Sequence, residues 1–292
     1  MKALYDLPAP AKLNLFLHVV GRRDDGYHLL QSAFVLIDWC DTLHVERRAD
    51  ARLARHDLGD ALPADDLCLK AARALQQESG TPFGADISID KRVPSGAGMG
   101  AGSSDAATTL LALNCLWQLH WPRSRLLALG LALGADVPFF LGGHNAFVEG
   151  IGEKLTPIEI PRQWFAVVKP AASVSTREIF ASPLLIRDTE AVILAGFLAH
   201  AGASRGFGLG SLGRNDMQPA ATSRCAEIGE AARWLDARFG HSRMTGSGSA
   251  VFAGAGTGAM PALALPDDPA AGWVARMCRS LERHPLRDFA EG

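Results

Sequence analysis

The sequence predicts a protein built from both α-helices and β-strands and arranged in two parts. Segments in which apolar and polar residues alternate, as in strands, occur among segments with helical spacing and helix-end signals. From about residue 157 the pattern begins again with a strand, a loop and helices. The length of 292 residues leaves room for one large domain or two ordinary ones. We therefore expect a mixed fold that divides near this residue.

Composition and charge exclude several classes of protein. Hydrophobic residues make up 48% of the chain and charged residues 21%, which is ordinary for a globular protein. The net charge of -2 provides no basic face, so we expect no nucleic-acid partner. The longest apolar stretch, residues 126–135, is too short to span a bilayer, and the N-terminus lacks a signal-peptide pattern. Five cysteines without Cys-x-x-Cys spacing predict free thiols and no metal framework, so we expect a cytoplasmic protein without a membrane partner.

The first expected element is a strand over residues 11–19. Apolar residues from Ala11 to Val19 occupy every second position and form one face of this strand. The other face carries Lys12 and Asn14 next to each other. The alternation predicts a half-buried strand whose polar face is either solvated or turned toward a functional site.

The remaining elements follow from the same signals and from turn residues. After a polar turn at 21–28, the first part has expected strands at 34–37, 43–46 and 87–89, helices at 65–78, after residue 102 and at 124–133, and a hairpin at 146–155. The second part has an expected strand at 164–168, a helix at 227–239, a Gly/Ser loop at 244–250 before a strand, a helix at 273–281 and a strand at 285–289. Residues 201–213 approach low complexity, which predicts a surface loop.

A glycine-rich loop ahead of the second helical segment is the strongest functional signal. Glycine occupies every second position from Gly96 to Gly102, and Ser103, Ser104 or Asp105 is available as the N-cap of the helix that follows. Such a loop presents backbone N–H groups and the positive end of a helix dipole, which together bind phosphate. The alternative is a plain connecting loop, but the order of strand, glycines and capped helix favours a phosphate site.

Two well-known phosphate-binding fingerprints do not fit this loop. A P-loop would require Gly-Lys-Ser/Thr, whereas Gly102 is followed by two serines. A dinucleotide-binding unit would require a second strand that ends in an acidic residue, whereas residues 117–123 form a connection. The sequence therefore disfavours both P-loop enzymes and dinucleotide-dependent oxidoreductases.

Asp136 is a second candidate functional residue. It lies between the end of a helix and Pro138, surrounded by apolar residues, where a lone carboxylate is unusual. Asp136 is therefore either a structural helix cap or a catalytic carboxylate with reduced access to water.

These segments together resemble the GHMP kinases, a family of small-molecule kinases. The family signature is Pro-x-x-x-Gly-x-Gly-x-x-Ser-Ser, and it is filled here by Pro94, Gly98, Gly100, Ser103 and Ser104. Four further segments, at 10–15, 21–28, 133–140 and 246–250, extend the resemblance over nearly the whole chain. Within the family they resemble the branch that phosphorylates the 2-hydroxyl of a cytidine diphosphate-linked methylerythritol, a small-molecule substrate. Gly26-Tyr27-His28 is the segment that narrows the substrate.

The resemblance implies a fold, a division of the chain and two cofactors. The fold is α+β, the two-domain GHMP kinase fold, with a ribosomal protein S5 domain 2-like N-terminal domain over residues 1–155 and a ferredoxin-like C-terminal domain over 156–292. The cofactors are ATP and Mg²⁺. The residues implied to hold the ATP phosphates are Pro94, Gly96, Gly98, Gly100, Ala101, Gly102, Ser103 and Ser104, with one of the two serines near the metal. No residue of the chain is assigned as a metal ligand.

The resemblance also implies roles at the acceptor end of the site. Asp136 corresponds to the carboxylate that accepts the proton of the substrate hydroxyl, and Lys12 to the cation that holds both groups in place. The implied substrate-binding residues are Asn14, Tyr27, His28, Thr176 and Phe180. Among them, Tyr27 stacks on cytosine, His28 binds the edge of the base, and Phe180 closes an aromatic sandwich. For Phe180, a buried side chain without a ligand is the alternative.

The chain departs from the family pattern at two places. Asp66 stands where Asn is more common, so we carry over no contact with the purine at that position. Gln218 stands where an acidic residue is common, and we expect a structural role for it.

Two other kinds of function remain as alternatives: another GHMP small-molecule kinase, or a non-catalytic nucleotide-binding protein. Mevalonate, homoserine and sugar kinases share the glycine loop but give no reason for the segment from Gly26 to His28. A non-catalytic nucleotide-binding regulatory protein would not need Lys12 and Asp136 together. The oligomeric state does not follow from the sequence.

Overall fold

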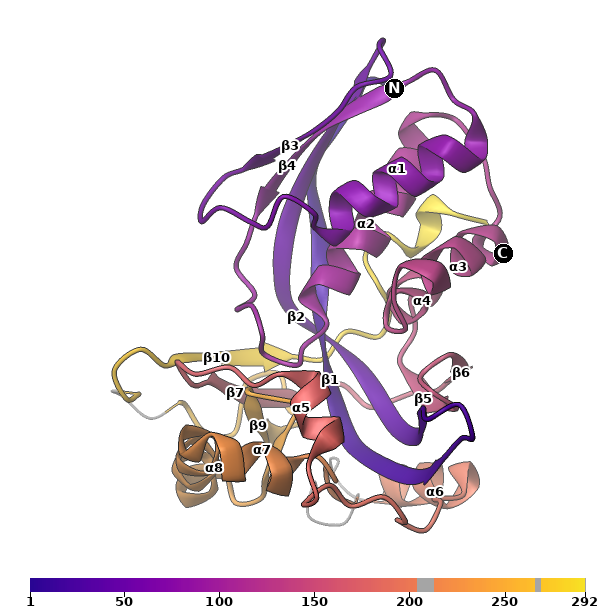
Figure 1. The fold of residues 1–292 in the computed structure, drawn as a ribbon. Helices are drawn as coiled ribbons and strands as arrows, with labels where there is room; N and C mark the ends of the chain where they lie inside the picture. Colours follow the sequence, from indigo (N-terminus) through magenta and orange to yellow (C-terminus); the bar gives the residue numbers. More distant parts are fainter. Residues whose placement is uncertain (204–212, 266–268, 292) are drawn as a thin grey trace.

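Two long antiparallel strands, β1 (Ala3–Arg22) and β2 (His28–Arg48), extend through both parts of the molecule (Figure 1). They are seen in a computed structural model of the chain, which describes residues 1–203, 213–265 and 269–291. The pairing of β1 with β2 shifts register at four places, between Leu4 and Gly21. Such bulges bend a strand and increase its twist, so one continuous ribbon can join the upper part to the lower part. The separate strands expected at 34–37 and 43–46 are therefore sections of β2.

The upper part is a six-stranded sheet covered by helices on one face (Figure 1). The strand order is β3-β4-β2-β5-β6, and β1 pairs with β2. The strands are β3 (Leu53–Asp57), β4 (Gly84–Asp90), β5 (Ala146–Glu149) and β6 (Lys154–Pro157), and the helices are α1 (Leu67–Ser79), α2 (Ala101–Leu116), α3 (Arg123–Leu133) and α4 (Val137–Gly142). The short elements β3 and α4 were not expected from the sequence.

The ends of α1 and α2 test the capping residues that the sequence indicated. Helix α1 ends before Gly80 as expected, with φ of 64° at that glycine. It begins at Leu67 and not at residue 65, because Asp66 is the N-cap and its carboxylate accepts the N–H of Leu69 at 3.1 Å. The N-cap expected for α2 at residues 103–105 is wrong, since Gly100 holds that position in a left-handed conformation with φ of 71°. The helix thus starts inside the glycine loop, and both serines belong to its first turn.

The lower part is a four-stranded antiparallel sheet with the order β10-β7-β9-β8. Its strands are β7 (Trp164–Lys169), β8 (Ser242–Met244), β9 (Val251–Gly256) and β10 (Val274–Arg279), and the helices between β7 and β8 are α5 (Thr176–Ala181), α6 (Leu194–Ala203), α7 (Gln218–Arg224) and α8 (Ala226–Phe239). The first strand in sequence lies between the last and the third, with the second strand at the edge, which is the strand order of a ferredoxin-like sheet. The α+β fold class is thus confirmed.

Two elements near the C-terminus differ from expectation. The helix expected at 273–281 is wrong, because residues from Val274 to Arg279 form an edge strand that pairs with β7. The strand expected at 285–289 is wrong too, since Arg287–Phe289 forms a 3₁₀ turn, η2. In both places the local pattern suits more than one conformation, and the distant pairing partner decides between them.

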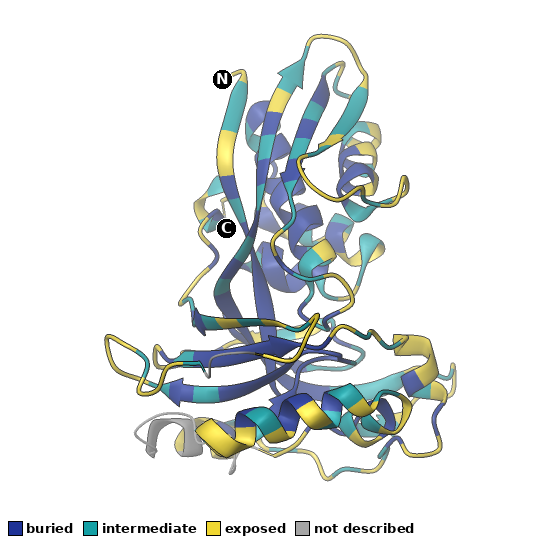
Figure 2. Cartoon of the chain, turned by 90° about the vertical axis from the view of Figure 1, so that its left-hand side faces the viewer, coloured by how far each residue is buried: buried dark blue, intermediate teal, exposed yellow. Residues whose placement is uncertain are grey.

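Three apolar clusters form the core. One lies between the upper sheet and α1–α4, one packs α7 and α8 on the lower sheet, and the third joins the two sheets around Phe16, Phe147, Phe165 and Phe252. Residues 11–19 are consequently buried on both faces, so the expected half-buried strand is wrong. Figure 2 shows this buried stretch where the long strands pass between the helices and the lower sheet.

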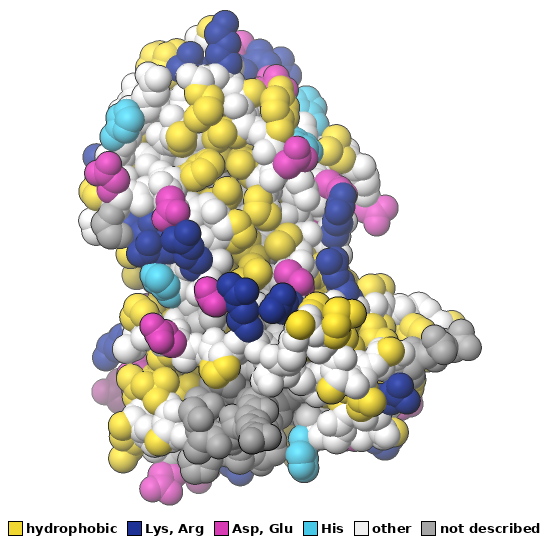
Figure 3. All heavy atoms as spheres, turned by 180° about the vertical axis from the view of Figure 1, so that it is seen from behind, with side chains coloured by type: hydrophobic (Ala, Val, Ile, Leu, Met, Phe, Trp, Pro, Cys, Tyr) yellow, Lys and Arg dark blue, Asp and Glu magenta, His cyan; other side chains and the backbone are white. Residues whose placement is uncertain are grey.

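The surface carries charges of both signs. The face turned away from the viewer in Figure 1 has a band of hydrophobic side chains on its upper part, and Lys and Arg side chains gather where the two parts meet (Figure 3). Within the described ranges, no helix is long and apolar enough to cross a membrane. The surface loop expected at 201–213 falls mostly on residues 204–212, which lie outside the described residues.

Residues beyond β10 return to the upper part and contact α3 and α4. The N–H of His284 donates to the carbonyl of Gly143 at 2.9 Å. The Arg123 guanidinium donates to the carbonyls of Leu141, Arg287 and Ala290, the last at 2.7 Å. These hydrogen bonds connect the segment after β10 to α4, the helix that begins directly after Asp136.

We expect His284 to make the protein less stable in acid. Burial, together with the positive charge of Arg123, lowers the pKa of His284 to about 4, whereas an unfolded His titrates near 6.5. The neutral ring is favoured in the folded state, so its contribution is fully present above pH 6.5 and is lost as the pH falls toward 4. The loss amounts to about 3 kcal/mol of unfolding free energy.

The variant His284→Asn isolates this effect in urea unfolding curves measured from pH 7 to pH 4. Asn keeps an oxygen acceptor for the N–H of Leu286, which His284 Nδ1 accepts at 3.1 Å, but it does not titrate. The unfolding free energy of the variant should depend less on pH than that of the parent protein. Parallel curves for the two proteins would rule out His284 as the titrating group.

Candidate active site

A cleft of about 950 Å³ lies between the glycine loop, the start of α4, the β1–β2 ribbon and α5. This volume is in the range of pockets that bind small molecules. The sequence-predicted residues that line it are Lys12, Asn14, Tyr27, His28, Gly98, Gly100, Ser103, Asp136, Thr176 and Phe180. Residues far apart in the chain are thus brought together in one cavity.

Lys12 and Asp136 form the centre of the cleft. Lys12 Nζ lies 4.0 Å from Asp136 Oδ2 and donates to Asn14 Oδ1 at 2.5 Å and to the carbonyl of Gly98 at 3.0 Å. The ammonium group also lies 4.7 Å from the centre of the Phe34 ring. Burial lowers the pKa of Lys12, and the nearby Asp136 carboxylate acts against that change. The side chain is therefore a buried cation held in one position.

The two interpretations of Asp136 can now be separated. Asp136 holds the N-cap position of α4, but its side chain makes no capping hydrogen bond. Its carboxylate is 33% exposed and faces Lys12 across the cleft. The structural-cap alternative is not supported, because the carboxylate remains available to a ligand.

Asn14 connects the two parts of the chain around the cleft. Its Oδ1 accepts from Lys12, from the N–H of Gly246 at 2.9 Å and from Thr245 Oγ1 at 3.1 Å, while its Nδ2 donates to Ser32 Oγ at 3.0 Å. The polar face of β1 is thus covered by the two glycine-rich loops and not by solvent. Since its amide is occupied by the protein, Asn14 is placed to position Lys12, and a direct substrate contact stays a prediction.

Glycine is required in this loop by the structure of the protein itself, apart from any ligand. Gly96, Gly98 and Gly100 all have positive φ, between 63° and 74°. A Cβ atom at Gly98 would lie 2.3 Å from the carbonyl oxygen of Thr245, and one at Gly100 would lie 3.0 Å from the Phe140 ring. Glycine therefore allows the loop to pack against the 244–250 loop and α4.

A second cavity of about 250 Å³ lies against the same loop. Its lining combines residues near the start of α1 with sequence-predicted residues of the glycine loop. The former are Leu62, Pro63, Asp66, Leu67 and Cys68, and the latter are Pro94, Gly96, Gly98, Gly100, Ala101 and Gly102. The structure also separates the two serines of the motif. Ser103 lines the large cleft, whereas Ser104 is buried and faces neither cavity, and its Oγ has no hydrogen-bond partner within the described chain.

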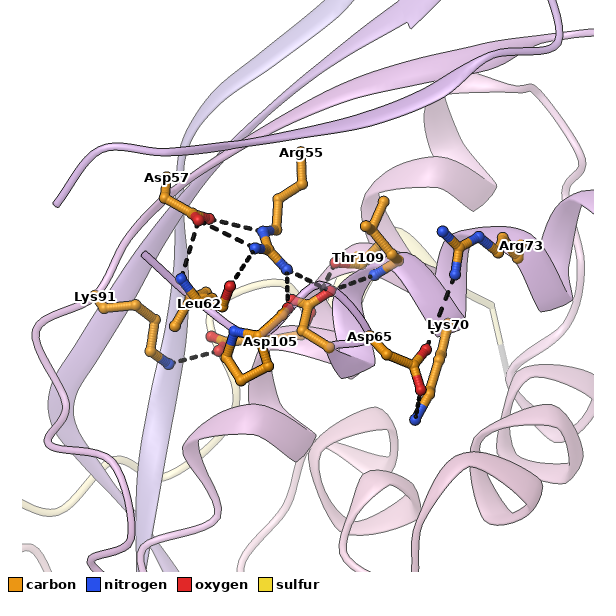
Figure 4. Close-up of polar contacts among 12 residues, drawn as sticks. Arg55, Asp57, Leu62, Asp65, Lys70, Arg73, Lys91, Asp105 and Thr109 are labelled. Carbon is orange, nitrogen blue, oxygen red and sulfur yellow. Dashed lines mark hydrogen bonds and ion pairs between the residues drawn. The ribbon is translucent and has the colours of Figure 1, made fainter. Parts of the chain in front are cut away.

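Arg55 holds the turn that covers the second cavity (Figure 4). Its guanidinium pairs with Asp57 at 2.7 Å and with Asp66 at 3.0 Å, and it donates to the carbonyls of Leu62 at 3.0 Å and Pro63 at 2.8 Å. The departure at Asp66 thereby gains a structural explanation, because this residue both caps α1 and pairs with Arg55.

A buried charge cluster supports the other side of this cavity. Lys91 Nζ binds the carboxylates of Asp41 and Asp105. Figure 4 shows the contact with Asp105, which measures 2.6 Å. Burial raises the pKa of Asp105 well above its usual range. Burial alone would lower the pKa of Lys91, but the two carboxylates raise it, so the lysine stays charged. The cluster fixes the strand end that enters the glycine loop.

Aromatic residues form the far wall of the large cleft. Tyr27 is 60% exposed, and the His28 ring stacks on Phe180 with centres 4.9 Å apart and planes 23° apart. Thr176 Oγ1 lies 2.6 Å from Ser247 Oγ, which joins α5 to the second glycine-rich loop. Phe180 is half-buried and lines the cleft, so the alternative of a buried Phe without access to a ligand does not hold.

Several residues of the site were missed by the sequence analysis. The 244–250 loop was recognised as a Gly/Ser segment and as part of the family resemblance, but none of its residues was assigned to the site. Thr245 binds Asn14, and Ser247 binds Thr176. Arg55 gave no signal, because its partners are set by the fold. The structural role expected for Gln218 is supported, since its Oε1 accepts the N–H of Met244 at 3.0 Å.

The donor set allows only a weakly held metal ion. No group of three or more His, Cys, Asp or Glu side chains could hold a metal among the described residues. Mg²⁺ is commonly bound by one or two carboxylates together with substrate phosphates. Asp136 and Ser103 both line the cleft and carry side-chain oxygen atoms, which fits a magnesium ion carried on nucleotide phosphates.

A glycine-rich loop at the start of a helix, opposite a fixed Lys–Asp pair in a cleft between two parts, is the arrangement of a small-molecule kinase of the GHMP type. Residues 66–144 match the family of GHMP kinases N terminal domains. The same fold occurs in the homoserine kinase from Cytophaga hutchinsonii, with a TM-score of 0.68 and 16% identity over 97% of this chain and 96% of that one. The resemblance to this family is confirmed.

Proteins with higher sequence identity to this chain identify its branch within the GHMP kinases. The chain is 64% identical over 292 residues to the 4-diphosphocytidyl-2-C-methyl-D-erythritol kinase of Methylibium petroleiphilum, covering 99% of both. It is 55% identical over 294 residues to that of Paracidovorax citrulli, again covering 99% of both. A crystal structure of 4-(cytidine 5'-diphospho)-2C-methyl-D-erythritol kinase matches with a TM-score of 0.73 and 34% identity over 85% of this chain and 89% of that one. The chain belongs to the 4-diphosphocytidyl-2-C-methyl-D-erythritol kinase family.

We expect Arg55→Met to weaken the binding of ATP and to leave the acceptor unaffected. The variant removes the contacts that hold the 62–66 turn against the second cavity, whose lining includes the glycine loop implied to hold the ATP phosphates. The KM for ATP should rise about 3- to 10-fold, as for the loss of one or two hydrogen bonds. The control is Arg48→Met, which breaks ion pairs with Asp50 and Asp86 on the same sheet away from both cavities. An equal rise in both KM values would contradict this role.

Proposed function

We propose that this protein transfers the γ-phosphoryl group of ATP to the 2-hydroxyl of 4-diphosphocytidyl-2-C-methyl-D-erythritol, a step of the methylerythritol phosphate pathway to isoprenoid precursors. The observation that carries the proposal is the Lys12–Asp136 pair at 4.0 Å, set in a cleft between the glycine loop and an aromatic wall. The full-length similarity to proteins with this name supports the choice of substrate.

The Lys12–Asp136 pair provides the acid–base chemistry of the proposed reaction. Asp136 accepts the proton of the substrate hydroxyl as the hydroxyl oxygen bonds to the γ-phosphorus of ATP, and the bond from that phosphorus to the β-phosphate oxygen breaks to release ADP. Lys12, fixed by Asn14 and the Gly98 carbonyl, orients the hydroxyl and the carboxylate toward each other. Phosphoryl transfer depends mainly on positioning and on neutralising charge, so a rigid buried cation suits this role.

The glycine loop provides the binding site for the donor. The backbone from Gly98 to Ser103 directs the start of α2 toward the cleft, where its free N–H groups would bind the ATP phosphates. Mg²⁺ would be held by the phosphates together with the Ser103 hydroxyl and Asp136, and when bound it neutralises charge on the transferred group. The burial of Ser104 supports Ser103 as the serine in this role.

The aromatic wall provides the binding site for the acceptor. Tyr27 is exposed in the cleft and would stack on cytosine, while His28 would bind the edge of the base and Phe180 would lie behind it. Mevalonate and homoserine lack a base, so this wall disfavours them as acceptors. We also place the enzyme in the cytoplasm, on the basis of its five free cysteines.

We propose a functional division of the chain near residue 155. The glycine loop, Lys12 and Asp136 would belong to an N-terminal domain over residues 1–155, and α5 with the 244–250 loop would belong to a C-terminal domain over 156–292. This division is supported by the change of sheet between β6, which ends at Pro157, and β7, which begins at Trp164.

ADP release measured with each candidate acceptor tests the proposed function. Turnover should require the cytidyl-linked acceptor and should be absent with mevalonate, homoserine and sugars. Turnover with one of those acceptors and none with the cytidyl compound would overturn the proposal.

Asp136→Asn should lose roughly 10²-fold or more in kcat, because the amide cannot accept the hydroxyl proton. ATP binding, followed by fluorescence of a labelled analogue, should stay near that of the parent protein. The matched control is Asp65→Asn, an exposed carboxylate on the entry to α1 that pairs with Lys70 and lines neither cavity. Near-normal turnover of the Asp136 variant would exclude the carboxylate as the base.

Tyr27→Ala should weaken binding of the cytidyl acceptor by about 1–3 kcal/mol, which is the typical contribution of a base stacked on an aromatic ring. The change should be seen as a higher KM for the acceptor with the KM for ATP unchanged. Tyr5→Ala is the control, since Tyr5 is the other tyrosine of the chain and is similarly exposed at the distant end of β1. An unchanged acceptor KM would place Tyr27 outside the binding site.

A further inference from the structure

Arg187 contacts two parts of the aromatic wall of the cleft, His28 at the start of β2 and Phe180 in α5. One terminal nitrogen donates to the carbonyls of Phe180 and Ser182, both at 2.9 Å, and the other donates to the carbonyl of Leu185 at 3.1 Å. Its Nε donates to His28 Nε2 at 3.3 Å. Arg187 thus connects α5 and the turn after it to the start of β2.

The hydrogen bond from Arg187 determines where the proton of the His28 ring is located. A guanidinium has only donors and stays charged in proteins, so His28 Nε2 must accept with its lone pair. The ring that satisfies this bond is a neutral imidazole with its proton on Nδ1. Burial and the positive charges of Arg187 and Arg22 lower the pKa of His28, which also favours the neutral ring.

The remaining nitrogen of the ring is available to a ligand. His28 lines the cleft, and its Nδ1 has no hydrogen-bond partner within the described part of the chain. The stack on Phe180 holds the plane of the ring, with centres 4.9 Å apart. His28 therefore offers the cleft one N–H donor in a fixed orientation.

We propose that Arg187 is a positioning residue that sets His28 as a donor from Nδ1 and thereby selects cytosine over uracil in the acceptor. This inference rests on the proposed function, since it concerns the base of the same substrate. The ring nitrogen N3 of cytosine is an unprotonated acceptor, which matches the donor. N3 of uracil carries a proton, so two donors would face each other, and a buried donor without a partner weakens binding.

A purely structural role for Arg187 makes a different prediction. The three backbone carbonyls that it binds belong to the end of α5 and the following turn, and a brace for that turn would affect stability alone. Only the positioning role changes the tautomer of His28 and the preference for the base. These two quantities are therefore the readouts of the test.

The first measurement is the tautomer of His28 in the free enzyme. Protein labelled with ¹⁵N in its histidine side chains is examined by long-range ¹H–¹⁵N NMR at pH 8. The His28 signals are assigned as those that are lost in His28→Gln. The parent protein should show protonated Nδ1 and unprotonated Nε2, and Arg187→Met should shift His28 toward the other tautomer. The control Arg224→Met, which breaks an exposed pair with Glu178 on the same α5, should keep the parent pattern.

The second measurement is the preference for the base. Binding of CDP and UDP is measured by calorimetry, and kcat/KM is measured for the cytidyl acceptor and its uridyl analogue. Arg187→Met should lower the preference for cytosine about tenfold, through the KM of the acceptor, with the KM for ATP unchanged. Arg187→Lys keeps the charge but not the planar fork, and should recover only part of the preference.

The outcomes separate this proposal from the proposed function. A parent His28 ring protonated at Nε2, or a variant that loses thermal stability while keeping the tautomer and the CDP-over-UDP preference, would overturn the role of Arg187. No turnover of the cytidyl acceptor by the parent protein would overturn the proposed function. In that case the tautomer and the CDP-over-UDP preference still decide the role of Arg187.

Discussion

The buried polar face of β1 is the constraint on which the rest of the site depends. A buried ammonium group is costly unless it is paired and hydrogen-bonded. Lys12 meets this requirement through Asn14, the Gly98 carbonyl and Asp136, and Asn14 in turn binds the loop at Gly246. Groups from four separate stretches of sequence are thus held around one cation. The same contacts that make Lys12 tolerable in the interior also arrange the cleft.

Local signals in the sequence were sufficient for much of this arrangement. The alternation in residues 11–19 placed Lys12 and Asn14 on one face, the capping residues placed α1, and the glycine motif indicated a loop at the start of a helix. Asp136 was recognised from its unusual apolar surroundings. Each of these inferences depends on residues within a few positions of one another, where backbone geometry translates directly into sequence pattern.

The features that could not be predicted depend on distant partners. The pattern of β10 suits either a helix or an edge strand, and its pairing with β7 decides. Burial of both faces of β1 requires the lower sheet and the second glycine-rich loop, which lie more than 100 residues along the chain. The motif could not separate Ser103 from Ser104, because their orientation follows from a helix that begins at Ala101. Arg187 reaches His28 only through the fold.

The segment after β10 also bears on the order in which the protein can be assembled. The Arg123 guanidinium donates to the carbonyls of Leu141 in α4 and of Arg287 and Ala290 in the segment after β10. Residues 281–290 are synthesised long after the helices that they contact. The Arg123 guanidinium gains its bonds to Arg287 and Ala290 only when this segment is in place. Because residues 281–290 follow every strand of both sheets in the chain, the packing beside Asp136 is completed only after all of those strands have been synthesised.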